Sequence, residues 1–204
     1  MPRTSTRGGP QTRARIAQIA DKLFYEHGFE NVTVAQVAKE AGVSSVTVFK
    51  HFPRKEDLFL DRSEDAVELL RSAVRDRAAD TDVLESLRMM ALGLTATSHP
   101  LSGLDPASDP FFATLAASPA LIARARDIAS DLQQTLIDEL QQDDAFDGDA
   151  SLLAAFFIAG YSTVLVETAR RRIAGESPED ATDEHRTRLE QMFTALREGV
   201  LTRS

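Results

Sequence analysis

The 204-residue sequence contains no cysteine. This absence excludes disulfide bonds, thiolate metal sites and redox sensing by cysteine. The first ten residues have no apolar run of the kind that a secretory signal needs. The most apolar stretch, residues 152–166, is too short to span a bilayer, so we expect it to form a buried helix. We therefore expect a cytoplasmic protein with no membrane partner.

Patterns typical of catalysis and metal binding are also missing. The four histidines have neither an i, i+4 partner nor a carboxylate at ligand spacing. Residues 143–149 resemble a calcium loop, but Ala145 and Ala154 occupy positions that need oxygen ligands, so we interpret the segment as a solvated acidic turn. The sequence has no nucleophile elbow, P-loop or dinucleotide fingerprint. We expect no enzymatic activity, no cofactor and no metal site.

Charge is divided unevenly along the chain, and lysine is absent after Lys55. Residues 1–60 contain nine Lys or Arg and six Asp or Glu, whereas residues 61–204 contain fourteen Arg and twenty-six Asp or Glu. The net charge is therefore +3 in the first segment and −12 in the second, which together give the −9 of the whole chain. A basic head on an acidic body suits a protein that approaches a polyanion with its head alone. An acidic solvated surface without further meaning is the alternative.

Residues 33–52 have the pattern of two short helices joined by a glycine-centred turn. Thr33 and Ser44 stand where N-cap hydroxyls are needed. Gly42 stands where the backbone must take a left-handed conformation. This spacing predicts a DNA-binding helix-turn-helix, whose second helix enters the major groove.

The outward residues of the second helix are short, polar or cationic. Lys50 is the strongest candidate for a base or phosphate contact, and Val46 can touch a thymine methyl group. Ser45 and Thr47 can form hydrogen bonds with base edges or phosphates. The candidate DNA-binding residues are Thr33, Ser44, Ser45, Val46, Thr47, Phe49, Lys50, His51 and Lys55.

Three of these candidates fit phosphate contacts better than base contacts. They are Thr33, His51 and Lys55, the last of which is favoured by the positive end of its helix. Partial burial as a packing residue is the alternative for His51.

The run of residues 12–62 resembles the N-terminal domain of the TetR/AcrR family of bacterial transcription regulators. The matching marks are Ala20, Leu23, Phe24, Gly28, Phe29, Thr33, Val34, Val37, Ala38, Ala41, Gly42, Val43, Ser44, Phe49, His51, Phe52, Lys55, Glu56 and Leu58. The resemblance covers about a quarter of the chain and implies a homodimer joined through the final helices. In that family an aromatic hydroxyl commonly meets a phosphate at the position of Phe49, but phenylalanine has no hydroxyl, so we do not assign it that contact.

Beyond the head, every long segment has helical periodicity and none alternates like a strand. We expect an all-α fold of about nine helices: a three-helix domain with the helix-turn-helix, then a helical bundle. The expected divisions are a flexible basic arm at residues 1–11, the DNA-binding domain at 12–54, and a ligand-binding and dimerisation domain at 55–204. The expected body helices are residues 55–78, 80–99, 118–142, 149–174 and 177–201, with a short helix starting at 109.

The last two helices are more apolar than one buried stripe requires. Two such helices from each of two chains would form a four-helix interface around a two-fold axis. Burial within one subunit is the alternative explanation. The candidate interface residues are Phe156, Gly160, Val164, Met192, Phe193 and Leu196.

Apolar and aromatic residues of the central helices are candidates for a ligand pocket, with ordinary core packing as the alternative. They are Met89, Met90, Phe111, Phe112, Phe157 and Tyr161. Because these candidate residues are apolar and few charged residues accompany them, they favour a small, mostly apolar effector.

Together these features predict a homodimeric, sequence-specific regulator, acting as a repressor that such an effector releases from a palindromic operator in double-stranded DNA. Two heads would bind grooves about 34–36 Å apart, and an effector that changes this distance would weaken binding. The alternatives are a ligand-independent DNA-binding or architectural protein with the same head, and a helical enzyme with a fortuitous one.

Overall fold

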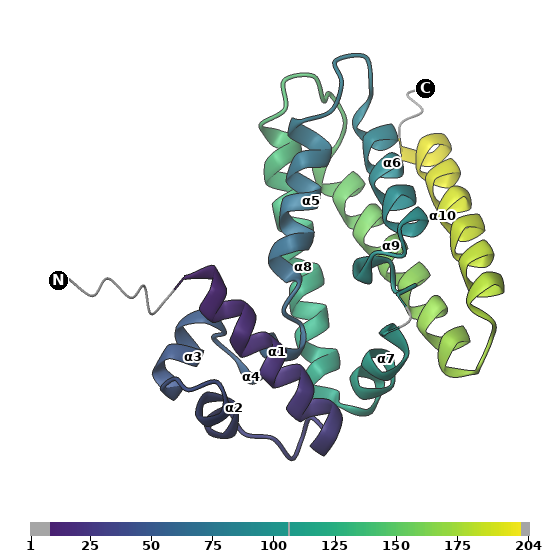
Figure 1. Ribbon diagram of the computed structural model, residues 1–204. Coiled ribbons are helices and arrows are strands. Elements are labelled where there is room, and N and C mark those ends of the chain that lie inside the picture. The colour runs from purple at the N-terminus through teal and green to yellow at the C-terminus, as the bar shows by residue number, and fades with distance from the viewer. Residues whose placement is uncertain (1–8, 106, 201–204) are drawn as a thin grey trace. The chain divides into compact units, whose positions relative to one another are not determined.

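The computed structural model describes residues 9–105 and 107–200, and within them all regular structure is helical (Figure 1). These residues form ten α-helices and one short 3-10 helix, which confirms the all-α fold with one α-helix more than expected. The elements are α1 (Pro10–His27), α2 (Val34–Glu40), α3 (Ser45–His51), α4 (Lys55–Phe59), α5 (Ser63–Arg75), α6 (Val83–Ala96), η1 (Pro100–Ser102), α7 (Ser108–Ala117), α8 (Pro119–Gln141), α9 (Ala150–Ile173) and α10 (Pro178–Val200).

The chain divides into two compact units. Unit 1 comprises Met1–Asp61 and Thr114–Ala125, and unit 2 comprises Arg62–Ala113 and Arg126–Ser204. Unit 1 therefore extends past the expected boundary at residue 54 and includes the first residues of α8. Residues 10 and 11, expected in a flexible arm at 1–11, belong to α1, which begins at Pro10; residues 1–8 lie outside the described residues.

Unit 1 is built around an aromatic cluster. The rings of Phe24 and Phe29 lie 5.0 Å apart, and that of Phe59 lies 6.0 Å from the first and 5.9 Å from the second. Ile16 on α1 and Val48 on α3 are completely buried in the same unit. Because α1 packs against both α2 and α4, it forms the platform on which the short helices are held.

The chain breaks its helix where it passes from one unit to the other. A single helix over 55–78 was expected, but α4 ends at Phe59 and α5 starts at Ser63. Phe59 is buried in unit 1, whereas Leu70 and Val74 are buried in unit 2. The two ends of the expected helix thus belong to different cores, and the break falls at the boundary between them.

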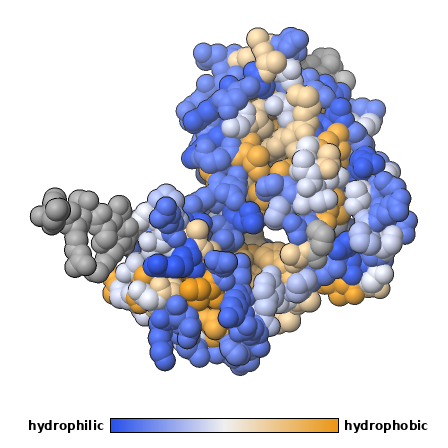
Figure 2. Space-filling view, viewed as in Figure 1, coloured by the Kyte–Doolittle hydropathy of each residue, from blue (hydrophilic) through white to orange (hydrophobic). Residues whose placement is uncertain are grey.

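Unit 2 is a bundle in which α6 packs against α5 and α10, and α10 lies along α9 (Figure 1). Its core includes Leu87, Leu153, Phe157 and Leu189, each at most 1% exposed. In the view of Figure 2, hydrophobic residues gather in the middle of this unit, while hydrophilic residues cover the outer side of α10. Burial of the aliphatic and aromatic side chains is the main force that holds the bundle.

Carboxylate caps begin two of the long helices of unit 2, at Asp149 where the helix was expected to start and at Asp82, two residues after the expected start at 80. The Asp82 carboxylate accepts a hydrogen bond from Glu85 N at 2.8 Å, and that of Asp149 accepts one from Leu152 N at 2.9 Å. Each satisfies an amide that has no partner within its own helix. Between α6 and α7 the chain forms the short helix η1, and α7 begins at Ser108, one residue before the expected start at 109.

Helix α9 is longer than the apolar stretch from which it was predicted. It has 24 residues, so by length and composition it is able to cross a membrane, contrary to the expectation. Length and composition are weak evidence, because the core helix of a soluble protein passes the same test. Here one face of α9 supplies Leu153, Ala154 and Phe157 to the core of unit 2.

Candidate functional site

The helix-turn-helix is held by local hydrogen bonds. Thr33 caps α2 reciprocally with Gln36: Gln36 N donates to Thr33 Oγ1 at 3.3 Å, and Thr33 N donates to Gln36 Oε1 at 2.7 Å. Such a capping box satisfies amides at the helix start and fixes where the helix begins. It confirms that Thr33 is a cap.

The turn between α2 and α3 has the form of a Schellman motif. Val43 N donates to Ala38 O at 3.0 Å and Gly42 N donates to Lys39 O at 3.1 Å. Gly42 has a φ of +62°, a left-handed conformation that glycine adopts at little cost. Ser44 then caps α3 by accepting a hydrogen bond from Thr47 N at 3.1 Å. The predicted roles of Gly42 and Ser44 in the fold are confirmed.

Helix α3 has one buried and one exposed side. Val48 is completely buried, while Val46 is 78% exposed and Phe49 is 48% exposed. Lys50 is also exposed, whereas Ser45 and Thr47 are half-buried. The structure therefore brings Val46, Phe49 and Lys50 to the surface that a recognition helix would present to DNA.

Hydroxyl groups of three candidate residues are engaged within the motif. The Thr33 hydroxyl donates to Gln36 Oε1 at 2.9 Å, so its hydrogen is not available to a phosphate. The Ser44 and Thr47 hydroxyls lie 2.9 Å apart and share one hydrogen bond. A phosphate role for Thr33 therefore needs the capping box to open, while Ser44 and Thr47 together keep one hydroxyl hydrogen to donate.

The two remaining candidates for phosphate contact are partly held by unit 1. The Nε2 atom of His51 is buried and has no hydrogen-bond partner among the described residues, which favours the packing interpretation. The Lys55 ammonium lies 4.2 Å from the centre of the Phe29 ring, a cation–π contact. A phosphate would therefore compete with the Phe29 ring for the Lys55 ammonium, or bind the ammonium where it lies above the ring.

Lys39 is an exposed cation that was not among the candidates. Lys39 lies in the last turn of α2, and like Lys50 it forms no ion pair with any described residue. Both are exposed cations in a helix-turn-helix, where phosphate contacts position the protein on the duplex. Its outward position in α2 could be predicted from the sequence, but a DNA contact was not predicted for it.

Unit 1 also contains a segment far away in the sequence. Arg124 Nε donates to Asp57 Oδ1 at 2.6 Å, and Ser118 Oγ donates to Glu30 Oε1 at 2.6 Å. Asp57 also accepts a hydrogen bond from Arg54 N at 2.9 Å at the start of α4. The start of α8 is thus bonded to α4 and to the loop between α1 and α2, all within unit 1.

The candidate pocket residues lie in unit 2, but they do not share one environment. Phe157 is buried, stacked on Tyr161 at 6.0 Å and 6.0 Å from Phe193. The Tyr161 hydroxyl donates to Leu101 O at 3.1 Å, and burial raises its pKa. Met89, by contrast, is 51% exposed on α6 and is wrong as a lining residue of an interior pocket.

The other pocket candidates also pack among themselves. Phe111 and Phe112 form an edge-to-face pair at 5.6 Å, and Met90 is half-buried against the core. A side chain at Gly103 (φ +72°) would come within 2.7 Å of the Phe112 ring, so that ring lies directly against the backbone. A shallow surface depression of unit 2 lies elsewhere, on α10, between Thr187 and Glu198.

The candidate dimer residues are mostly used inside one subunit. Val164, Phe193 and Leu196 are buried in the core of unit 2, so they offer no surface to a partner and the prediction is corrected for them. A Cβ atom at Gly160 would meet Met192 Sδ at 2.6 Å, which shows that α9 and α10 approach closely there. Phe156 alone of the six is exposed, at 49%.

Helix α9 nevertheless has a second, exposed apolar stripe. Leu152, Phe156, Ala159, Val166 and Ile173 follow each other at intervals of three, four or seven residues and are all exposed. Residues at this spacing lie on one face of a helix. The apolar excess of α9 is therefore real, but it resides on this face and not on the face that packs against α10.

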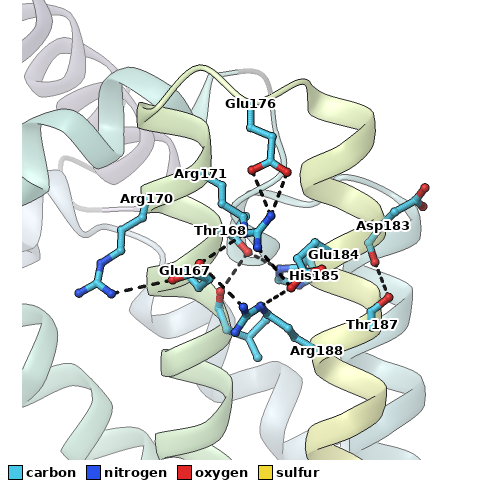
Figure 3. Close-up of polar contacts among 11 residues, drawn as sticks. Glu167, Thr168, Arg170, Arg171, Glu176, Asp183, Glu184, His185, Thr187 and Arg188 are labelled. Carbon is cyan, nitrogen blue, oxygen red and sulfur yellow. Dashed lines mark hydrogen bonds and ion pairs between the residues drawn. The ribbon is translucent and has the colours of Figure 1, made fainter.

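One end of the α9–α10 pair is joined by polar side chains that point toward one another (Figure 3). Arg171 bonds Glu176 at 3.0 Å and contacts Glu184 at 3.5 Å, linking the two helices. Beneath them, Thr168 Oγ1 lies 2.8 Å from His185 Nδ1. His185 is 1% exposed, its Nε2 atom has no described partner, and burial lowers its pKa to about 4.

A buried ion pair lies in the same unit. Arg172 donates from Nε and Nη2 to the two carboxylate oxygens of Asp109, at 2.7 and 3.0 Å. The Arg172 side chain is 5% exposed, whereas that of Asp109 is 45% exposed. The guanidinium has been taken out of water and depends on this carboxylate. Sequence spacing gave no indication of the pair, because 63 residues separate its members.

A capped helix-turn-helix with an exposed recognition helix, followed by an all-helical body, defines a helix-turn-helix transcription regulator. The sequence profile of the bacterial regulatory proteins of the tetR family matches residues 16–61. The DNA-binding region of the chain is therefore that of the TetR family of transcriptional regulators. Because that family consists of DNA-binding transcription factors, the finding agrees with the expectation that the chain is not an enzyme.

Similarity to individual proteins is strong only in the DNA-binding region. An HTH-type transcriptional regulator of Staphylococcus aureus (strain USA300) is 46% identical over 48 residues, which is 24% of this chain and 26% of that protein. The chain thus spans about a quarter of the length of the curated relatives it matches.

Two solved structures are similar over most of their length. Thermus thermophilus FadR, a TetR family transcriptional repressor in complex with lauroyl-CoA, is 25% identical with a TM-score of 0.55, covering 94% of this chain and 96% of that one. The SmeT–triclosan complex is 18% identical with a TM-score of 0.58, covering 91% of each chain. These likenesses confirm the fold of the body as well as the head.

Proposed function

We propose that this protein is a homodimeric repressor that binds a palindromic operator through its two α3 helices and is released by a small, mostly apolar effector. The observation that carries the proposal is the arrangement of α3. The turn before α3 is closed by backbone hydrogen bonds, and Ser44 caps the start of the helix. Val48 is buried in unit 1, while Val46, Phe49 and Lys50 remain exposed.

Lys50 provides the test of DNA binding. Replacing Lys50 by alanine is expected to lower operator affinity by about 1–3 kcal/mol and to relax preference at one base position, because a specific contact is lost. Binding is measured by fluorescence anisotropy on duplexes selected from random DNA. Lys22→Ala removes an exposed lysine from α1 and is the matched control. Unchanged affinity of Lys50→Ala for every duplex would exclude α3 as the recognition helix.

The exposed stripe of α9 supports a homodimer. Five exposed apolar residues at helical spacing on one helix form an apolar patch, and such a patch marks an interaction surface. A two-fold arrangement would bring the stripe of one chain against that of its partner, since an isologous interface uses the same patch twice.

Phe156→Arg tests the assembly by placing a charge in the middle of the stripe. The expected result is a monomer in light scattering with operator affinity lowered about 100-fold or more, because the second head no longer binds intramolecularly. Met89→Arg is the control, since Met89 is similarly exposed on α6. Strong binding of an inverted repeat by a monomeric variant would exclude the proposed geometry.

Support for an apolar effector comes from the composition of unit 2 and from the two similar structures. The lauroyl-CoA bound to FadR has an apolar acyl chain on a charged carrier, and the triclosan bound to SmeT is an apolar aromatic compound. The same two compounds are therefore suitable first probes. Release of an operator requires several kcal/mol of differential effector affinity between the bound and free states, so an effective compound would lower DNA affinity more than about 10-fold.

A ligand-independent DNA-binding protein is the second candidate. It is favoured by the packing of Phe157, which contacts Tyr161 and Phe193 as an ordinary core residue does. This candidate predicts sequence-dependent binding that neither probe compound changes.

A further inference from the structure

The exposed face of α3 is unusually apolar for a surface that is to meet DNA. Val46 is 78% exposed and Phe49 is 48% exposed. Being three residues apart on a helix, they are neighbours on one face. Neither is required by the core of unit 1, which Val48 and Phe52 complete from the other side of the helix. The pair is therefore free to contact a partner.

The same helix is poor in groups that identify bases by paired hydrogen bonds. Guanine is read by arginine or lysine, and adenine by asparagine or glutamine. Helix α3, with the sequence SVTVFKH, has no arginine, asparagine or glutamine. The Thr47 hydroxyl is 2.9 Å from that of Ser44 and belongs to the cap. Lys50 is left as the one long donor on this helix.

The surroundings of the pair indicate what covers it. Lys50 follows Phe49 directly, and Lys39 is exposed at the end of α2, both without an ion pair to a described residue. Exposed cations on the same two helices as an apolar pair suit a partner that offers both phosphates and methyl groups. The major groove of DNA has this chemistry, because the C5-methyl group of thymine projects into it.

We propose that Val46 and Phe49 are specificity-determining residues that recognise thymine methyl groups in the major groove. This inference rests on the proposed operator binding. Each operator half-site then contains thymines at the positions that face α3. Sequence preference comes mainly from apolar contact with these methyl groups, while Lys50 adds a phosphate or guanine contact.

The test compares thymine with uracil, which differ by this methyl group alone. Bound duplexes are selected from random libraries synthesised with thymine, and each enriched thymine is then replaced by deoxyuridine. The affinity of the unmodified protein for the duplex is expected to fall about fourfold for each contacted thymine that is replaced, because each contact buries one methyl group. Selection from a library synthesised with uracil is expected to lose the preference at the same positions.

Variants assign the effect to the two side chains. Val46→Ala and Phe49→Leu each remove part of the apolar contact and are expected to reduce the thymine-to-uracil difference at one position of the half-site. Lys50→Ala is expected to weaken binding to both duplexes while keeping their ratio. Tyr25→Leu is the matched control, because Tyr25 is 48% exposed in the same unit. Far-UV circular dichroism establishes that each variant is folded.

The outcomes separate the inference from the function on which it rests. A defined operator bound equally well with thymine or uracil would overturn the inference and leave the repressor intact, as would variants that retain the full difference. Failure to select any preferred sequence would overturn both. Substitutions at Val46 or Phe49 that change the oligomeric state and not the base preference would assign the pair to a protein contact and overturn the inference.

Discussion

The two units of the molecule are stabilised in different ways. In unit 1 the short helices are fixed by caps between residues close in sequence, such as Thr33 with Gln36 and Ser44 with Thr47. In unit 2 the long helices are joined across large sequence separations, by core residues and by ion pairs such as that of Arg172 with Asp109. Local caps thus fix the ends of the two short helices that would face DNA, whereas the long helices of unit 2 are joined mainly by contacts between residues far apart in the sequence.

The largest expected effect concerns the buried histidine of unit 2. Because burial lowers the pKa of His185 from 6.5 to about 4, the folded state disfavours its protonation. The unfolded state then binds the proton first, so stability is fully present above pH 6.5 and is lost as the pH falls toward 4. The loss over this window is about 3 kcal/mol, at 1.36 kcal/mol for each pKa unit.

Urea denaturation between pH 7 and pH 4 measures this loss. His185→Gln is expected to flatten the dependence, while His27→Gln, at an exposed position on α1, is expected to leave it unchanged. If His185→Gln showed the same pH dependence of stability as the unmodified protein, groups other than His185 would cause the acid sensitivity.

The next largest effect is expected at the buried ion pair. Asp109→Ala leaves the Arg172 guanidinium without its carboxylate and is expected to lower the free energy of unfolding by about 2–3 kcal/mol, slightly less than for a fully buried pair because Asp109 is partly exposed. The exposed pair of Asp183 with Arg186 supplies the control, Asp183→Ala, whose expected cost is below about 1 kcal/mol. Equal effects would show that burial is not what makes the first pair important.

The smallest effect is expected in unit 1. Thr33→Ala removes one side of the capping box and is expected to cost about 1 kcal/mol, and Thr33→Ser, which keeps the hydroxyl, should cost much less. Chemical denaturation monitored on the DNA-binding region gives both values. A Ser variant as unstable as the Ala variant would mean that the threonine methyl group, and not the cap, is responsible.

The difference between the units also determined what could be predicted. The start and turn of the helix-turn-helix, with Thr33, Gly42 and Ser44 in their roles, were predicted because caps and turns depend on residue types at short spacing. The expected start of a helix at residue 149 agrees with the position of Asp149 as the N-cap of α9, for the same reason. The exposed positions of Val46 and Lys50 followed from helical periodicity.

Features that depend on tertiary contacts were missed. The segment between α4 and α5 contains no glycine or proline, so the sequence does not indicate a break there. The break arises because Phe59 is buried in unit 1 and Leu70 in unit 2. The bond between Arg124 and Asp57 joins residues 67 apart. On α9 two faces are apolar, and periodicity alone could not decide which of them packs against α10. Val164 was consequently assigned to an interface although it is buried within the subunit.

The distribution of lysine has a practical consequence. All four lysines, Lys22, Lys39, Lys50 and Lys55, lie in unit 1, and the body carries only arginine cations. Isotopic dimethylation of amines would therefore give an NMR spectrum in which every side-chain signal reports on the DNA-binding region. The Lys55 methyl groups would be shielded by the Phe29 ring beneath them, so their resonance would reveal directly whether that stacking survives when the protein binds DNA.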